Sequence, residues 1–224
     1  RRLMWQNMYH LYRRTCGATG KELISHYAPN TDYTVYDNKY WWGHQWDPKD
    51  FGQEYDESQS FFEQFLRLNK VVPHPSLNTD FHLDENSNYW NFAGNQKNCY
   101  LVFHASFNRD CLYGTGIKNC QDVLDCLNVF DSELCYSCTD VKGGYNLKFC
   151  SDSHHCSDSW FLKNCIGCKH CFGCVNLRQK EYYLFNKPVG RENFEKYMKN
   201  FQSGSYDVLN TLRKQFLDFL MTIP

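Results

Sequence analysis

Cysteine recurs at a fixed interval in the second half of the chain, and this spacing limits the possible folds more than any other feature. Four cysteines lie fifteen residues apart, at Cys120, Cys135, Cys150 and Cys165. When residues 91–180 are written in rows of fifteen, small or sulfur-bearing side chains stand at every third position. One further column is mainly aliphatic and contains Val102, Ile117, Ser132, Leu147, Leu162 and Leu177. A fixed internal period of this kind is typical of a solenoid, in which each turn buries its inner face against the next.

We therefore predict a mainly β protein built on a narrow β-solenoid (β-helix) of five to six coils, with about fifteen residues in each coil. A coil this narrow has room for small side chains and one larger apolar column. Cysteine suits such an interior because its side chain is compact and apolar. Asn, Asp and Gly between the columns would form the turns. The alternative is a tandem array of small metal-binding knuckles.

The stretch CIGCKHCFGC brings four cysteines together, Cys165, Cys168, Cys171 and Cys174, each separated by two residues. Cysteines at this spacing also hold iron–sulfur clusters, although the proline that usually accompanies such a run is absent and Val175 follows. All four positions fall in inward columns of the predicted coil. We therefore predict a structural lining that needs no cofactor, with a zinc site and an iron–sulfur cluster as the two alternatives.

The flanks of the repeat differ from it in composition. Residues 1–85 predict an α+β segment with a basic amphipathic helix at its start, a strand at Leu23–Ser25, an aromatic and acidic stretch over 31–57, and a core-packing helix over 58–70. Residues 86–187 would form the solenoid. Residues 188–224 predict two amphipathic helices that cap or flank it, the second with Leu209, Leu212, Phe216, Phe219 and Leu220 on one stripe.

A second candidate metal ligand lies near the start of the chain. Cys16, followed by Gly17 and Gly20, forms half of a zinc knuckle, and a full site needs two Cys or His pairs. His10 and His26 could complete it, but neither has the expected spacing from Cys16. A buried thiol is the simpler interpretation of Cys16.

Two groups of residues are candidates for binding a partner, either a protein or a nucleic acid. The basic start has Arg1, Arg2, Arg13 and Arg14, which could contact phosphates, although a solvated helix face explains them as well. The tryptophans Trp41, Trp42 and Trp46 could form a platform for a sugar or a protein, or could pack an irregular segment onto its neighbours.

Composition excludes several classes of function. The net charge is −1, which gives no general attraction to nucleic acid or membranes, and no apolar run approaches the ~18 residues of a membrane span. We find no signal peptide and expect a cytoplasmic location. No Ser–His–Asp order, nucleotide-binding glycine loop or HExxH motif occurs. We therefore predict a non-enzymatic scaffold or binding module. The alternatives are a metal-binding or thiol-redox protein using Cys165–Cys174 and, less well supported, a polysaccharide-active β-helix protein.

Several motifs together resemble a family of cysteine-rich predicted proteins from uncultured small-genome bacteria, which combine a zinc ribbon with a cysteine repeat. The motifs are TGKELISHY, VYDNKYWWGHQWDP, FFEQF, NCYLVF, CSDSWFLKNCIGCKHCFGCVNLR and YYLFNK. The resemblance covers nearly the whole chain. It implies that Cys16 is the remnant of a ribbon whose other ligands lie upstream of Arg1, and it implies no established activity. Ser132 departs from the aliphatic column, and Val141 and Lys180 depart from cysteine columns.

Overall fold

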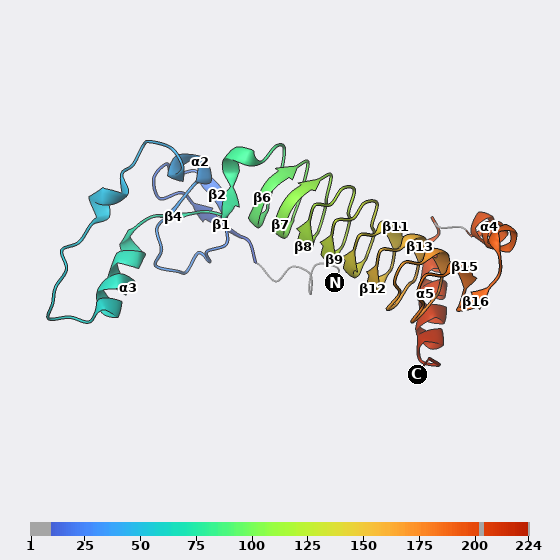
Figure 1. Ribbon diagram of the computed structural model, residues 1–224. Helices are drawn as coiled ribbons and strands as arrows, with labels where there is room; N and C mark the ends of the chain where they lie inside the picture. Colours follow the sequence, from blue (N-terminus) through green and yellow to red (C-terminus); the bar gives the residue numbers. More distant parts are fainter. Residues whose placement is uncertain (1–9, 202–203, 224) are drawn as a thin grey trace.

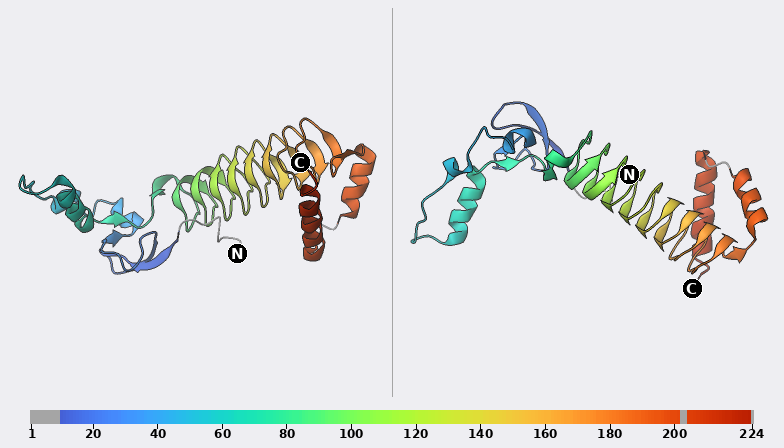
Figure 2. Two further views of the ribbon diagram at one scale, coloured as in Figure 1. Left: turned by 90° about the horizontal axis from the view of Figure 1, so that it is seen from below. Right: turned by 45° about the horizontal axis from the view of Figure 1, so that its top comes forward.

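The protein is elongated, with a β-solenoid as its central body. The structure is a computed structural model and describes residues 10–201 and 204–223. The solenoid separates an N-terminal unit, which we define as residues 10–78, from two C-terminal helices (Figures 1 and 2). The predicted mainly β solenoid with helices at its C-terminal end is confirmed, and it has about nine turns rather than the five to six expected.

Parallel strands form the walls of the solenoid. One seven-stranded sheet and one five-stranded sheet run along it, and consecutive strands within each sheet are parallel except for the last pair. The first sheet contains β5 (Thr79–Asp80), β6 (Asn91–Lys97), β7 (Phe103–Arg109), β8 (Thr115–Lys118), β9 (Leu127–Phe130), β10 (Thr139–Lys142) and β12 (Ser151–His154). The second contains β11 (Tyr145–Lys148), β13 (Ser157–Trp160), β14 (Lys169–Phe172), β15 (Glu181–Leu184) and β16 (Lys187–Pro188).

Each turn of the solenoid has twelve residues, so the predicted length of about fifteen is wrong. Thr115 pairs with Leu127, Leu127 pairs with Thr139, and Thr139 pairs with Ser151. The error has a physical source. Side chains point inward at every third residue. Because twelve and fifteen are both multiples of three, the same residues point inward with either length of turn. The spacing of the cysteines therefore shows which side chains are buried but does not determine how many residues separate stacked neighbours.

The backbone between inward residues follows a three-residue rhythm. The residue before each inward position has a positive φ, such as 53° at Asn98, 54° at Asp110 and 53° at Asn119. Asn, Asp and Gly tolerate this left-handed conformation better than other residues. Their side chains also bond between turns, since Asn98 Nδ2 donates to Asp110 Oδ1 at 2.8 Å and Asn119 Nδ2 donates to Asp131 Oδ1 at 2.9 Å. These pairs are twelve residues apart and fix the register of stacking.

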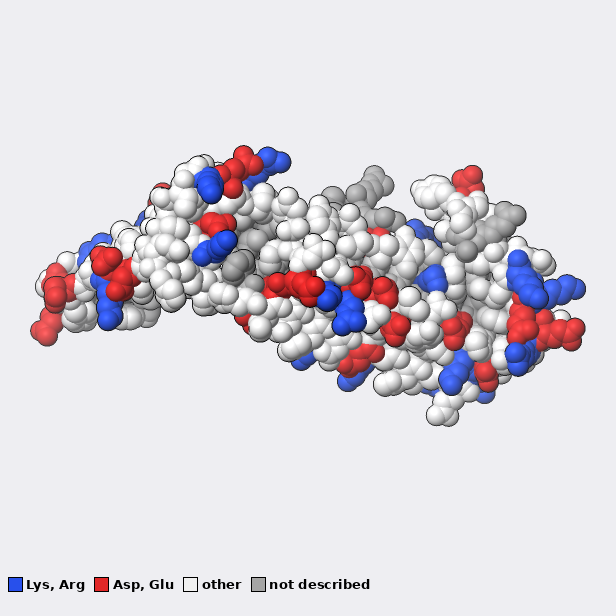
Figure 3. Space-filling view, turned by 90° about the horizontal axis from the view of Figure 1, so that it is seen from above, with Lys and Arg blue, Asp and Glu red and all other residues white. Residues whose placement is uncertain are grey.

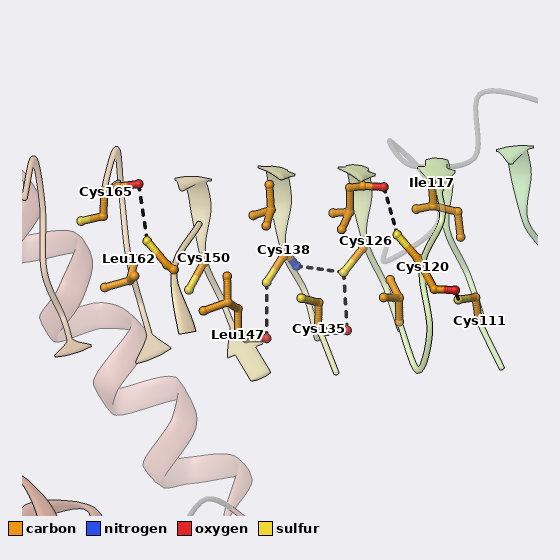
Figure 4. Packing of buried hydrophobic residues seen from close by; sticks show 14 of the residues in the cluster. Cys111, Ile117, Cys120, Cys126, Cys135, Cys138, Leu147, Cys150, Leu162 and Cys165 are labelled. Atoms are coloured by element: carbon orange, nitrogen blue, oxygen red, sulfur yellow. Dashed lines mark hydrogen bonds between the residues drawn. The ribbon is translucent and has the colours of Figure 1, made fainter. Parts of the chain in front are cut away.

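The interior is a continuous column of sulfur and aliphatic side chains. Twelve of the thirteen cysteines belong to this cluster, together with residues such as Val102, Ile117, Leu147 and Leu162. Figure 4 shows Cys120, Cys126 and Cys138 pointing into the space between the walls from successive turns. All thirteen cysteines are unbridged thiols. The column buries its apolar surface only because the turns above and below cover it.

The N-terminal unit has short elements. A hairpin of β1 (Tyr12–Thr15) and β2 (Glu22–Ser25) confirms the strand predicted at Leu23–Ser25. The helix predicted at the start of the chain is contradicted at Tyr12–Thr15, because pairing with β2 overrides the helical spacing of its apolar residues; Arg1, Arg2 and the rest of 1–9 lie outside the described residues. The unit also contains β3 (Val35–Tyr36), α2 (Asn38–Trp41), η1 (Pro48–Phe51), α3 (Phe61–Val71) and β4 (His74–Pro75), and η2 (Phe81–Leu83) follows β5.

The helix predicted over 58–70 is present as α3, but its predicted role in core packing is wrong. Ser60 caps it by accepting from the Glu63 N–H at 3.3 Å. None of its eleven residues is buried, and the Phe62 side chain is 74% exposed. The helix projects from the far end of the N-terminal unit, away from the solenoid (Figures 1 and 2). The amphipathic pattern therefore predicts the helix correctly but not its neighbours.

The C-terminal helices flank the last turns of the solenoid, as predicted. Helix α4 spans Arg191–Asn200 and α5 spans Tyr206–Leu220. Phe216 of α5 packs against Phe161, with ring centroids 5.7 Å apart, in a cluster that also buries Phe172 and Phe194. Among the described residues, no helix is long and apolar enough to cross a membrane.

Candidate functional site

The cysteines of CIGCKHCFGC occupy one turn of the solenoid. Because side chains point inward at every third residue and a turn has twelve, Cys165, Cys168, Cys171 and Cys174 fill all four inward positions of that turn. All four are fully buried. The prediction that these positions face inward is therefore confirmed, and the shorter turn gathers them more closely than a fifteen-residue coil would.

The thiols of this turn are engaged with backbone carbonyl groups. Each donates to the carbonyl oxygen two residues earlier, at distances from 3.2 Å for Cys171 to 3.6 Å for Cys168. Cys165 also lies 3.5 Å from the carbonyl oxygen of Cys174 in a second such contact. A carbonyl oxygen needs a donor, so these contacts favour the protonated thiol. A thiolate bound to a metal would face the same oxygens without a proton between them.

Burial also favours the protonated form of the thiols along much of the solenoid interior. It raises the pKa of the Cys120, Cys126 and Cys150 thiols, because a thiolate loses its hydration there. Within the CIGCKHCFGC turn, the pKa values of the thiols shift in different directions. Bonding to the thiols of Cys156, Cys165 and Cys171 lowers the pKa of Cys168 and raises theirs. Bonding to Cys171 likewise lowers the pKa of Cys174.

The inward sulfurs are oriented as part of the wall rather than around a common centre. Within residues 10–201 and 204–223, no group of three or more His, Cys, Asp or Glu side chains is arranged to hold a metal ion. The contacts of the sulfurs with carbonyl groups explain their orientation. A zinc site and an iron–sulfur cluster at Cys165–Cys174 stay predictions.

Cys16 has a different environment from the solenoid thiols. Its Sγ accepts from the Asp37 N–H at 3.3 Å. Burial raises the pKa of Cys16. Hydrogen bonds from the Thr19 side chain and from backbone groups of Asp37, Thr19 and Ala18 lower the pKa by more than burial raises it, so the net shift is downward. This donor set stabilises a thiolate, as a knuckle around a metal ligand does. His10 and His26 form no metal-binding group with it among the described residues.

The two described arginines of the basic start are used within the fold. Arg13 forms an ion pair with Glu22 at 2.9 Å. The Arg14 guanidinium donates to the carbonyl oxygens of Ala28 and Tyr33, each at 2.9 Å. Arg14 thus ties the hairpin to the loop that follows it, which is a structural role.

Acidic and basic side chains are interspersed along the face of the solenoid shown in Figure 3.

The three tryptophans lie near an open cavity. Trp41 Nε1 donates to the Pro73 carbonyl oxygen at 3.1 Å, and Trp46 Nε1 donates to the Trp41 carbonyl oxygen at 2.8 Å, so both anchor the chain locally. Trp42 is 47% exposed. A cavity of about 850 Å³ is lined by Trp41, His44, Trp46, Asp47 and Asp50 among others. Its aromatic and acidic lining is compatible with the predicted platform for a sugar or a partner, which stays a prediction.

Sequence reasoning missed an apolar row on the outside of the solenoid. Tyr100, Leu112, Leu124 and Tyr136 are twelve residues apart and stack in successive turns. Their neighbours Tyr89, Leu101 and Tyr113 widen this row into a stripe. The signal was available in the sequence as a twelve-residue spacing, but it could be seen only with the correct length of a turn.

No protein-family model matches the chain, and no curated protein sequence matches it significantly. The structure is therefore the basis for any functional proposal.

Proposed function

We propose that the chain is a non-enzymatic scaffold that binds partner proteins through its N-terminal unit, with the solenoid as a rigid spine. The thiols that could have made the interior reactive are buried and bonded to carbonyl groups, which supports a structural role for the wall. The surface that binds partners then lies outside the solenoid interior, on the elements that flank it.

The observation that carries this proposal is the exposed apolar face of α3. Phe61, Phe62, Phe65 and Leu66 are between 51% and 74% exposed. An isolated helix shorter than ~12–15 residues is only marginally stable in water, and α3 has eleven. Helices of this kind gain their stability by packing an apolar face against a partner, and exposed apolar patches mark sites of protein association.

A nucleic-acid partner has less support. Arg13 and Arg14 bond to groups of the N-terminal unit itself. The chain carries a net charge of −1. A nucleic-acid surface depends on many free cations, because phosphate contacts supply most of its affinity.

Site-specific photocrosslinking in the cells that make the protein tests this proposal. A photoreactive amino acid replaces Phe62 in one variant and Tyr206, which is 77% exposed at the other end of the molecule, in a matched control. We expect a protein adduct from position 62 and none from position 206. Equal labelling at both positions, or none at position 62, would contradict the proposal.

Metal binding or thiol redox chemistry at Cys165–Cys174 is the second candidate function. One observation favours it: a single turn supplies four inward sulfurs, and the pKa of Cys168 is lowered by bonding to neighbouring thiols. For a metal to bind there, the thiols would have to release their carbonyl acceptors and lose protons. Such a site would lose its metal or its redox activity in a Cys168→Ser variant.

A further inference from the structure

Among the residues that the structure describes, a helix covers the apolar stripe on the solenoid at its C-terminal end but not at its N-terminal end. In its C-terminal part, α5 packs on the stripe and crosses the turns of the solenoid (Figures 1 and 2). Arg213 stands over the Phe149 ring at 5.0 Å, Phe216 meets Phe161 at 5.7 Å, and Phe219 meets Phe185 at 5.6 Å. These contacts follow the helix from one turn of the solenoid to later ones. The stripe is therefore a surface on which an amphipathic helix of this chain packs.

The N-terminal part of the same stripe lies beyond the reach of these contacts. We call it the open stripe and define it as Tyr89, Tyr100, Leu101, Leu112, Tyr113 and Leu124. Tyr89, Tyr100 and Leu112 are between 36% and 42% exposed. Tyr100 is flanked by Tyr89 at 5.5 Å and by Tyr113 at 5.8 Å between ring centroids, so the rings form a continuous surface. The open stripe continues the surface on which α5 already packs.

Helix α3 has the pattern that this surface accepts. In α5, Phe216 and Phe219 are three residues apart and make the ring contacts. In α3, Phe62 and Phe65 have the same spacing and are exposed. The sequence Gln-Phe-Leu occurs in both helices, at 64–66 and at 215–217.

The dimensions agree as well. At 1.5 Å per residue, the eleven residues of α3 span about 16 Å. Four turns of the solenoid, from the one that contains Tyr89 to the one that contains Leu124, are separated by three steps of ~4.8 Å and span about 14 Å. A helix of this length lying along the open stripe would cover it from end to end.

We propose that α3 of one molecule docks along the open stripe of a second copy of this chain. Within one molecule, α3 points away from the solenoid (Figure 2), so a second copy is the occupant that the chain itself supplies. The interface joins two different surfaces and is head-to-tail, so it forms open chains or rings rather than closing at a symmetric dimer. This inference rests on the proposed function and names the partner protein of α3.

Two variants and their mixture test this inference with purified full-length protein. Phe62→Asp disables α3, Leu112→Asp disables the open stripe, and Tyr206→Asp is the control at an exposed site elsewhere. Molar mass is measured by light scattering across a wide range of concentration, and circular dichroism and thermal unfolding verify that each variant is folded. We expect the mass of the wild type and the control to rise beyond a dimer, and each disabling variant to stay a monomer.

The mixture separates head-to-tail docking from other modes. The Phe62→Asp variant retains an intact stripe and the Leu112→Asp variant an intact α3, so mixing them should give a one-to-one dimer and nothing larger. A monomeric wild type at every concentration overturns the inference. So does a Leu112→Asp variant that still associates, which would indicate an α3–α3 contact, or a mixture that stays monomeric.

The two proposals can fail separately. If the purified wild type stays monomeric while position 62 crosslinks to a different protein in cells, the second copy is excluded as the partner and the scaffold proposal stands. If position 62 gives no adduct and the wild type is monomeric, both fail.

Discussion

At the scale of single residues, the cysteine side chain explains the interior of the solenoid better than a reactive site does. It is small enough for a narrow turn, apolar enough to be buried, and able to donate weakly to a carbonyl oxygen. Serine can replace it geometrically: Ser132 Oγ donates to the Phe130 carbonyl oxygen at 2.7 Å and accepts from the Gly144 N–H at 3.0 Å. An inward position can thus be filled by a small donor side chain that has no sulfur chemistry.

The buried thiols should make the protein sensitive to high pH. The pKa of Cys120, Cys126 and Cys150 is raised above the ordinary value of 9.0 by burial. A group whose pKa is higher in the folded state stabilises the fold fully below its unfolded pKa, and this stabilisation is lost as pH rises through the folded pKa. We expect the free energy of unfolding to fall above pH ~9, by up to about 1.4 kcal/mol per pH unit for each such thiol.

Urea unfolding at a series of pH values measures this effect. A Cys120→Ser variant removes one of these buried thiols and should have a shallower decline above pH ~9, since one fewer thiol titrates. A free energy of unfolding that stays constant or rises between about pH 8 and about pH 10.5, a range chosen to bracket the ~8.5 pKa of an unfolded cysteine, would show that the wall holds thiolates.

At the scale of elements, prediction from sequence succeeded where an element is local and failed where it depends on its neighbours. Both C-terminal helices and α3 were recognisable from apolar spacing and capping residues. The strand at Tyr12–Thr15 was not, because its apolar residues have helical spacing and only pairing with β2 makes it extended. The exposure of α3 could not be predicted either. An amphipathic pattern indicates that the apolar face packs against another surface, but it does not show whether that surface belongs to the same chain or to a different molecule.

Phe216 and Leu217 are adjacent in α5, but only Phe216 packs on the covered part of the stripe, so their substitutions can be compared directly. Phe216 is 8% exposed and meets Phe161, whereas Leu217 is 55% exposed. We expect Phe216→Ala to lower the free energy of unfolding by about 3 kcal/mol. Leu217→Ala should change it by no more than ~0.5 kcal/mol. Urea denaturation of the two variants measures both values, and equal losses would mean that α5 does not pack through this face.

At the scale of the whole molecule, the solenoid determines what can be changed without loss of the fold. Its architecture could be predicted from the three-residue rhythm of the sequence, whereas the length of a turn is recorded in residues twelve apart, among them the Asn and Asp pairs. Asn128 and Asp140, joined by a bond of 3.0 Å, are one such pair. Polar corner residues between turns are easily taken for ordinary surface side chains, which is why the cysteine spacing led to the longer period. The external stripe depends on the same length and could not be assembled without it.

A whole turn should be removable, because each turn contacts mainly its neighbours. Deleting the twelve residues Leu127–Cys138 joins Cys126 to Thr139 and keeps every later side chain in its column. Deleting only the eleven residues 127–137 moves every later inward side chain by one step. We expect the first variant to fold with its thiols resistant to alkylation and the second to expose them. Mass spectrometry after alkylation under native conditions distinguishes the two, and equal labelling would contradict a twelve-residue turn.

The metal content of the purified protein tests the central claim, that the cysteines form a structural wall, most directly. The measurement is elemental mass spectrometry on protein prepared without air or chelator, with the Cys168→Ser variant in parallel. The wall predicts no stoichiometric iron, and the same metal content in the variant as in the wild type. Iron or zinc at one or more atoms per chain that disappears in the Cys168→Ser variant would contradict it and make Cys165–Cys174 a metal centre.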